Sequence, residues 1–301
     1  MRTPATSFAG TVWRDSTAGA STGPGESRRL DVSFSELRDV ALEIAREVSA
    51  IPAQGQPRLH DAQALQVGLK STHLDIVTEL DQATETAILR ELAARRPGDG
   101  VLAEEGGARE SASGYTWVID PIDGTVNFLY GQPHWAISIG VLDSGGTAVA
   151  GVVHAPALGE TYVAARGCGA HLVVEDVWTE LTNPPECAFE LALLTTGFSY
   201  DPARRVDMAR ALADFLPRIR DVRRFGSAAI DICNVAMGRT NGYYERDLKP
   251  WDRAAAMVIA AEVGLAFEVH GDPSGHNLTV CAPPELAQRI IDELAALGIR
   301  D

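Results

Sequence analysis

The spacing of apolar side chains predicts helices over much of the chain. From residue 34 to residue 48, apolar residues recur every three or four positions, which is the repeat of one helix face. Ser33 and Glu36 have the form of a capping box, so this helix is predicted to begin at residue 34 and to end near Ile51. Similar spacing, interrupted by proline and glycine, predicts further helices at residues 81–96, 204–216, 227–237, 251–263 and 284–298.

Short apolar or alternating stretches predict the strands. Residues 101–103 and 117–119 are short apolar runs, and after residue 134 apolar stretches alternate with glycine-rich turns as in an antiparallel meander. Further strands are predicted at residues 135–142, 147–154, 160–165, 191–195, 222–225, 242–244, 266–269 and 278–281. The order of these elements predicts an α/β (α+β) protein of two α/β layers with the antiparallel meander between them.

The composition divides the chain into a tail and two halves. Residues 1–30 are rich in Ser, Thr, Gly, Ala and Pro without an apolar period, which predicts a disordered tail. The sequence changes character after the Asn-Pro-Pro stretch that begins at Asn183. We therefore expect an amino-terminal α+β half over residues 31–180, with most of the acidic motifs, and a carboxyl-terminal α/β half over residues 181–301.

The overall composition narrows the class of protein. The 301 residues are 46% hydrophobic and 22% charged, as in ordinary globular proteins, and no apolar run approaches the roughly 20 residues that cross a bilayer. The formal charge of −15 argues against a nucleic-acid partner, because phosphate backbones require a basic surface. The amino terminus lacks an apolar signal segment and the four cysteines form no zinc or pairing pattern, so we expect a cytoplasmic protein with reduced thiols.

One stretch, residues 117–128, concentrates the chemistry of the chain. Its first three residues predict a buried strand with Asp120 at the carboxyl end, and Pro121 is expected to prevent the chain from continuing as an interior strand. Asp123 follows, and then a Gly-Thr pair at residues 124–125 that suits a tight turn with outward backbone N–H groups. The stretch therefore predicts two carboxylates and several N–H donors at one strand end, where α/β proteins place ligands.

Further carboxylates are predicted at the ends of other elements. Each one alone is explained more simply as a helix cap or a solvated surface group. Together they predict a cation site, since two carboxylates about 4 Å apart repel by roughly 4 kcal/mol at an effective dielectric of 20. All-oxygen ligation favours Mg²⁺ over zinc, and the Ile122 carbonyl is a further candidate ligand. The acidic set is Asp81, Glu104, Asp120, Asp123 and Asp252.

Six segments form an ordered series of motifs over about residues 33–298. They are Asp75-x-Val77-Thr78-x-x-Asp81, Glu104-Glu105-Gly106, the stretch Trp117–Phe128, Gly226-Ser227-Ala228-Ala229 with Tyr243-Tyr244-Glu245, and Trp251-Asp252. This series resembles the inositol monophosphatase family of Mg²⁺-dependent, lithium-sensitive phosphatases. The resemblance implies a layered αβαβα sandwich and a homodimer.

The resemblance also implies a site that binds two Mg²⁺ ions, or three. The implied ligands are Glu104, Asp120 and the Ile122 carbonyl for the first ion, Asp120, Asp123 and Asp252 for the second, and Glu104 and Asp81 for a third, weaker one. The implied catalytic residues are Asp81, Glu104 and Thr125, and the implied substrate-binding residues are Asp123, Gly124, Thr125, Ala228 and Glu245. In this scheme Thr125, hydrogen-bonded to Asp81, orients a metal-bound water, backbone N–H groups at residues 124–125 receive the phosphate, and Glu245 meets polyol hydroxyls.

The expected activity is hydrolysis of myo-inositol 1-phosphate or a related polyol or sugar monophosphate. Direct attack by water is favoured, because no Ser, Cys or His nucleophile constellation is evident. Histidinol phosphate, 3′-phosphoadenosine 5′-phosphate and fructose 1,6-bisphosphate are alternative substrates for the same metal core. A different class of function, partner binding with a vestigial site, also stays open. For Arg223 and Arg224 a structural role is favoured over contact with substrate or a partner subunit.

Overall fold

The structure is a computed structural model that describes residues 32–55, 67–69 and 76–300. The predicted disordered tail over residues 1–30 lies outside the described residues. No helix within the described part of the chain combines the length and the apolar character that crossing a membrane requires.

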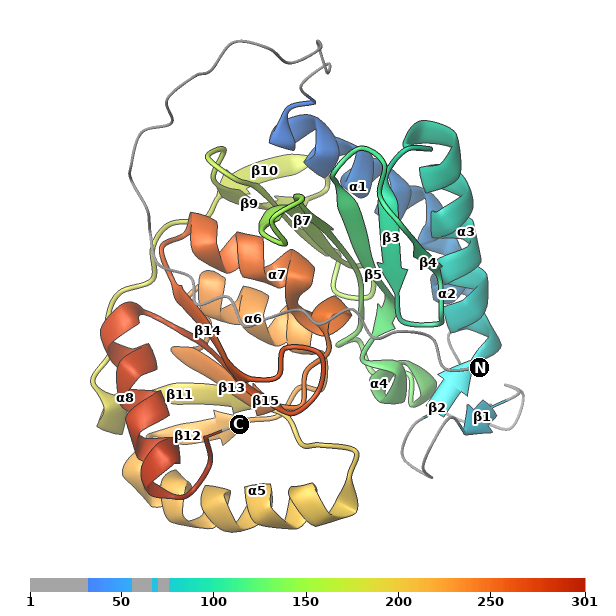
Figure 1. Ribbon diagram of the computed structural model, residues 1–301. Coiled ribbons are helices and arrows are strands. Elements are labelled where there is room, and N and C mark those ends of the chain that lie inside the picture. Colours follow the sequence, from blue (N-terminus) through green and yellow to red (C-terminus); the bar gives the residue numbers. More distant parts are fainter. Residues whose placement is uncertain (1–31, 56–66, 70–75, 301) are drawn as a thin grey trace.

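Helices and two sheets alternate in five layers (Figure 1), which confirms the αβαβα arrangement. The helices α1 and α3 pack on the outer face of the larger sheet. The helices α6 and α7 lie between the two sheets. The helices α5 and α8 pack on the outer face of the smaller sheet. The helices are α1 Phe34–Val48, α2 Ala50–Gly55, α3 Glu79–Arg95, α4 Thr125–Leu129, α5 Pro202–Phe215, α6 Ala228–Ala236, α7 Pro250–Glu262 and α8 Pro284–Ala296.

The larger sheet has eight strands in the order β10-β9-β8-β7-β6-β5-β3-β4. Its strands are β3 Gly100–Ala103, β4 Ala108–Arg109, β5 Thr116–Asp123, β6 Ala136–Leu142, β7 Ala148–Ala155, β8 Glu160–Ala165, β9 Ala170–Val174 and β10 Val177–Glu180. The predicted meander is therefore part of this sheet, and its placement as a separate layer was wrong. Two further strands, β1 Val67–Leu69 and β2 Ile76–Thr78, pair with each other.

Strand β5 continues past the point where the sequence predicted its end. Pro121 lies inside the strand, and the pairing with β6 shifts register between Asp120 and Asp123. The parallel partner β3 ends at Ala103, opposite Ile119, so the proline breaks no ladder bond on that side. As predicted, Pro121 does not lie in an interior strand, because β5 has a partner on one side only at this position, but β5 extends to Asp123 and does not end at Asp120.

The smaller sheet has five strands in the order β12-β11-β13-β15-β14. Its strands are β11 Leu193–Thr196, β12 Asp221–Arg223, β13 Gly242–Arg246, β14 Ala266–Gly271 and β15 Asn277–Ala282. The first three are parallel to one another, so their carboxyl ends lie along one edge, and β15 runs antiparallel to β13. Residues at the carboxyl ends of β12 and β13 thus lie at the same end of the smaller sheet, with β11 between the two strands.

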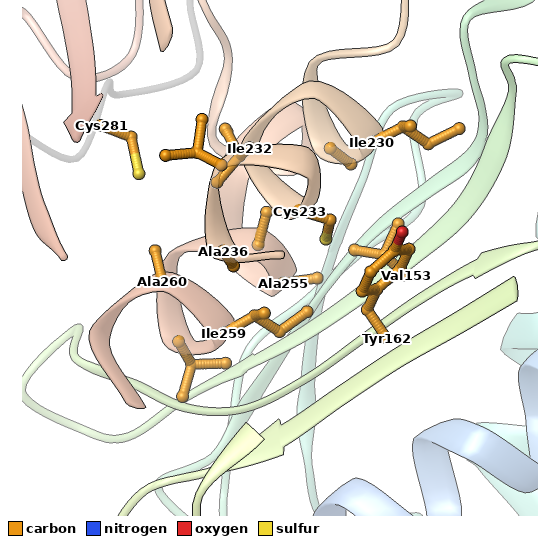
Figure 2. Close-up of a cluster of buried hydrophobic side chains, with 14 of the residues drawn as sticks. Val153, Tyr162, Ile230, Ile232, Cys233, Ala236, Ala255, Ile259, Ala260 and Cys281 are labelled. Carbon is orange, nitrogen blue, oxygen red and sulfur yellow. The ribbon is translucent and has the colours of Figure 1, made fainter. Parts of the chain in front are cut away.

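The core between the sheets is built from small side chains on α6 and α7 (Figure 2). Ala255 and Ile259 of α7 lie there beside Cys233 of α6 and Val153 of the larger sheet. The helix α7 approaches that sheet so closely that a Cβ atom at Gly140 would come within 2.8 Å of the Ala254 backbone. Glycine at this position therefore sets the distance between α7 and the larger sheet.

Candidate active site

Strand β5 brings two buried carboxylates to the edge of the larger sheet. The side chains of Asp120 and Asp123 are 2% and 8% exposed. Residues three apart in a regular strand point to opposite faces. The register shift between them changes this phase, and it lets both carboxylates face the same space.

The other three acidic residues lie just after β3 and at the starts of α3 and α7. Glu104 follows β3, which is parallel to β5, and its N–H donates to the carbonyl of Ile119 at 3.1 Å. Asp81 lies in the first turn of α3, and its side chain is buried. Asp252 lies in the first turn of α7, where its Oδ2 accepts a hydrogen bond from the Lys249 N–H at 2.6 Å.

The electrostatic effects of these carboxylates on Asp120 indicate that the five side chains lie near one another. Burial raises the pKa of Asp120 well above its usual range, and the negative charges of the four other acidic residues raise it further. The pKa of Asp252 is raised by burial and then by Glu104 and Asp123. Carboxylates raise each other's pKa in this way because neighbouring negative charges disfavour ionisation. The acidic set predicted from the sequence therefore forms one cluster.

Residues of α6 hold Asp123 in place. Ser227 is the N-cap of α6, and its hydroxyl donates to Asp123 Oδ2 at 2.5 Å. The N–H of Ala229 donates to the same oxygen at 2.8 Å. Burial raises the pKa of Asp123 to about 6, while these donors act in the opposite direction. The contact joins the smaller half of the chain to the strand that carries both central carboxylates.

The turn after Asp123 is fixed by its close contacts. Gly124 has a φ of +94°, and a Cβ atom there would lie 2.8 Å from the carbonyl of His134. Thr125 Oγ1 donates to the Ile122 carbonyl at 3.1 Å. Asn127 Nδ2 donates to the carbonyls of His134 and Phe225, at 2.7 and 2.6 Å. The backbone conformation at residue 124 thus requires glycine.

Glu245 lies at the end of β13, facing the acidic cluster. The hydroxyl of Tyr243 donates to Glu245 Oε2 at 2.7 Å. Burial raises the pKa of Glu245 to about 7, against the effects of Tyr243 and of the positive charge on Arg224. A Cβ atom at Gly197 would overlap the Glu245 carboxylate, so the backbone of residue 197 packs directly on it. Ala228, the first residue of α6, is also buried.

The donor set suits a hard divalent cation. Burial raises the pKa of Asp120, Asp123 and Asp252, so ionisation of these carboxylates requires a compensating positive charge, and oxygen ligands select Mg²⁺ or a similar ion. Within residues 76–300, however, no three acidic, histidine or cysteine side chains surround a common ion position. One oxygen each of Asp120, Asp123 and Asp252 instead accepts from backbone or hydroxyl donors of the protein. Metal binding therefore requires these side chains to adjust.

Several residues that shape the site were not predicted from the sequence. Glu85 on α3 accepts hydrogen bonds from the N–H groups of Glu105 and Gly107, at 2.7 and 3.0 Å, and so holds the loop after Glu104. Asp231 on α6 is 1% exposed, and the negative charges of Glu245 and Asp123 help to raise its pKa after burial. An acidic residue within an apolar helix was the available signal for Asp231. The hydrogen bond expected between Thr125 and Asp81 stays a prediction.

Comparisons with known proteins agree on one family. The sequence profile of the inositol monophosphatase family matches residues 33–297. An inositol-1-monophosphatase of Mycobacterium leprae is 40% identical over 272 residues, which cover 86% of this chain and 93% of that protein. A Pasteurella multocida protein named Nus factor SuhB is 38% identical over 265 residues, covering 86% of this chain and 95% of that protein. The solved structure of Mycobacterium tuberculosis SuhB superimposes with a TM-score of 0.75 at 38% identity, covering 89% of this chain and 98% of that one.

Proposed function

The chain belongs to the inositol monophosphatase family of phosphoric monoester hydrolases, and we propose that it hydrolyses myo-inositol 1-phosphate or a related polyol monophosphate with Mg²⁺. The observation that carries this proposal is the convergence of five carboxylates from β3, β5, α3 and α7. Such a cluster is costly in the folded protein unless cations bind to it. Phosphate esters are natural partners for such cations, because Mg²⁺ sites commonly share their ligands with substrate phosphate.

The proposed ligands follow from the positions of the acidic residues. Glu104, Asp120 and the Ile122 carbonyl would hold one ion, and Asp120, Asp123 and Asp252 a second, with Glu104 and Asp81 available to a third. When bound, Mg²⁺ neutralises phosphate charge and lowers the pKa of water in contact with it. Asp120 belongs to both proposed sets, and the negative charges of all four other acidic residues raise its pKa after burial.

The protein's own groups supply orientation and proton transfer. Thr125 and Asp81 would orient the attacking water, with Thr125 positioned by its hydrogen bond to the Ile122 carbonyl. The N–H groups of residues 124–125 would receive the phosphate oxygens at the start of α4, where Gly124 has a left-handed conformation. Glu245, fixed by Tyr243, would accept hydrogen bonds from polyol hydroxyls. In this scheme water attacks phosphorus directly, and no phosphoenzyme forms.

The decisive measurement is phosphate release from a panel of monoesters with Mg²⁺, with EDTA and with added Li⁺. The panel contains myo-inositol 1-phosphate, histidinol phosphate and 3′-phosphoadenosine 5′-phosphate. We expect polyol phosphates to be the best substrates, EDTA to abolish turnover and Li⁺ to inhibit it. Asp252→Asn removes a ligand charge and should lower kcat/KM by about 100-fold or more. Asp292→Asn, exposed on α8, is the matched control and should leave kcat/KM unchanged.

A second candidate function comes from the Pasteurella multocida relative named Nus factor SuhB, because that name does not describe a phosphatase. In this reading the chain binds a partner, and the acidic cluster is vestigial. The retention of every acidic residue of the predicted set favours the phosphatase. Inactivity of the folded protein towards the whole panel, with and without Mg²⁺, would favour the binding role.

We also infer a cytoplasmic homodimer. The four cysteines are free thiols, which supports a reducing compartment. The dimer rests on the family resemblance, and light scattering of the purified protein tests it directly.

A further inference from the structure

We propose that Arg224 is a specificity-determining residue that binds a second anionic group of the substrate, a phosphate or carboxylate, away from the phosphate that reacts. The inference rests on the proposed phosphatase function and adds a preference to it. Arg224 directly follows β12 and begins the short connection that leads through Phe225 and Gly226 into α6. Its side chain is exposed.

The contacts of Gly226 place the Arg224 guanidinium beside the proposed phosphate turn. Gly226 has a φ of +98°, and a Cβ atom there would lie 2.5 Å from Arg224 Nη1 and 2.8 Å from Asn127 Nδ2. On the other side, the Gly226 carbonyl would lie 3.2 Å from a Cβ atom at Gly124. The guanidinium therefore lies against Gly226, and Gly226 in turn lies against the turn at residue 124.

The charge of Arg224 acts on acidic groups from three different elements. It lowers the pKa of Asp123 on β5, of Asp231 on α6 and of Glu245 on β13, in each case against the larger effect of burial. It also lowers the pKa of Tyr200, which precedes α5. The guanidinium therefore lies within electrostatic range of Asp123 and of the proposed polyol contact at Glu245.

Arg224 has no hydrogen bond and no ion pair with any residue that the structure describes. Arg223, the preceding residue, differs, because its Nη1 donates to Asp221 Oδ2 at 2.5 Å and to the Val222 carbonyl at 2.8 Å. Its charge lowers the pKa of Asp221. Arg223 and Arg224 are therefore suited to comparison, because Arg223 forms an ion pair with Asp221 and Arg224 forms none with a described residue.

The chemistry of this position favours an anion as the ligand of Arg224. Guanidinium groups bind phosphate and carboxylate through two parallel hydrogen bonds, and an exposed group loses little hydration before the ligand arrives. The carboxylates of Asp231 and Glu245 would repel a second substrate anion if Arg224 were absent. A substrate with hydroxyl groups alone depends less on this positive charge. We therefore expect the preference for bisphosphates over monophosphates of the same polyol to depend on Arg224.

Steady-state kinetics with a matched pair of substrates test this inference. The pair is myo-inositol 1-phosphate and myo-inositol 1,4-bisphosphate, assayed with Mg²⁺ on wild type, Arg224→Gln, Arg224→Lys and Arg223→Gln. For Arg224→Gln we expect kcat/KM to fall about 10- to 100-fold for the bisphosphate, mainly through KM, and less than about 3-fold for the monophosphate. Arg224→Lys should recover part of the loss for the bisphosphate. Arg223→Gln should leave kcat/KM unchanged for both substrates.

An equal loss on both substrates, or no loss on either, would overturn the inference. Titration calorimetry of the same esters on the same variants separates this outcome from failure of the proposed function. If no ester is hydrolysed, the proposed function fails, but weaker binding of the bisphosphate alone by Arg224→Gln still supports the role of Arg224. If wild type binds the bisphosphate no more tightly than Arg224→Gln does, the role is refuted whatever the turnover.

Discussion

Residues without functional groups determine much of the geometry of this site. Gly124 adopts a left-handed conformation next to the carbonyl of His134, and Gly226 has the Arg224 guanidinium directly above it. Gly197 contacts the carboxylate of Glu245 so closely that no side chain fits between them. In each case the backbone approaches a functional group more closely than a Cβ atom allows.

Replacement of Gly197 by alanine tests the importance of this contact. The new methyl group must displace the Glu245 carboxylate from the hydroxyl of Tyr243. We expect KM for polyol phosphates to rise about 10-fold, because the displaced carboxylate loses its hydrogen bonds to the substrate. The measurement is Michaelis–Menten kinetics with thermal melting in parallel. Gly98→Ala is the control, since its nearest neighbour would be 4.0 Å away, and equal KM values for the two variants would contradict the expectation.

The elements of secondary structure bring together residues that are far apart in the sequence. The five acidic residues lie on or beside α3, β3, β5 and α7, and Ser227 at the N-cap of α6 fixes Asp123. On α3, the side chain of Glu85 accepts two backbone hydrogen bonds from the loop that follows Glu104. Glu85 thus acts on the proposed metal site through the position of that loop.

A change at Glu85 should therefore affect metal binding before it affects the fold. We expect Glu85→Ala to raise the Mg²⁺ concentration for half-maximal activity by about 10- to 100-fold, as for other residues that orient metal ligands. Glu85→Gln keeps one acceptor oxygen and should have a smaller effect. Mg²⁺ titrations of initial rate measure this, with Glu91→Ala on the same helix as the control. An unchanged Mg²⁺ requirement with a lower melting temperature would indicate a purely structural role.

The helices were predictable because their apolar period and their caps are local features. The capping box of Ser33 and Glu36 is present, and α1 begins at Phe34 as predicted. Strand β5 was predicted too short, since the tolerance of Pro121 depends on the register shift against β6. Strands β9 and β10 were not predicted, and β10 is exposed along its length, so it lacks the apolar pattern of a core strand.

The site was predictable in composition but not in geometry. The acidic set came from residue types at element ends and from the family resemblance, and the structure brings its members together. The contacts of Ser227, Glu85 and Arg224 depend on the packing of α6 and α3 against the loops, which sequence spacing does not contain.

At the scale of the whole molecule, the buried acidic cluster lowers stability unless it is protonated or binds cations. The pKa values of Asp120 and Asp252 are raised in the folded state. Their contribution to stability is therefore complete below the unfolded pKa of about 4 and is lost as pH rises through the folded values. His154 acts in the opposite direction, because burial lowers its pKa to about 4, but it is neutral in both states above about pH 7.

We therefore expect the EDTA-treated protein to lose stability as the pH rises from 7 to 8.5, because the Glu245 carboxyl, whose pKa is about 7 in the folded state, completes its ionisation over this range. Calorimetry should record a fall of about 2–4 °C in Tm for each kcal/mol lost. Saturating Mg²⁺ should restore stability, and more so at pH 8.5 than at pH 7, because the ion binds the ionised carboxylates. Asp120→Asn should have a smaller pH dependence in EDTA. A Tm that rises with pH in EDTA would contradict the raised pKa values.

The close approach of α7 to the larger sheet has a consequence for how the chain can be divided. Gly140 on β6 lets the backbone of α7 lie against that sheet, although α7 comes from the second half of the sequence. A fragment that stopped near residue 180 would uncover a wide apolar face and would lose Asp252 as well. We therefore expect that neither half folds stably without the other. Chimeras that combine halves of two relatives should fold only when α7 and the larger sheet come from the same parent.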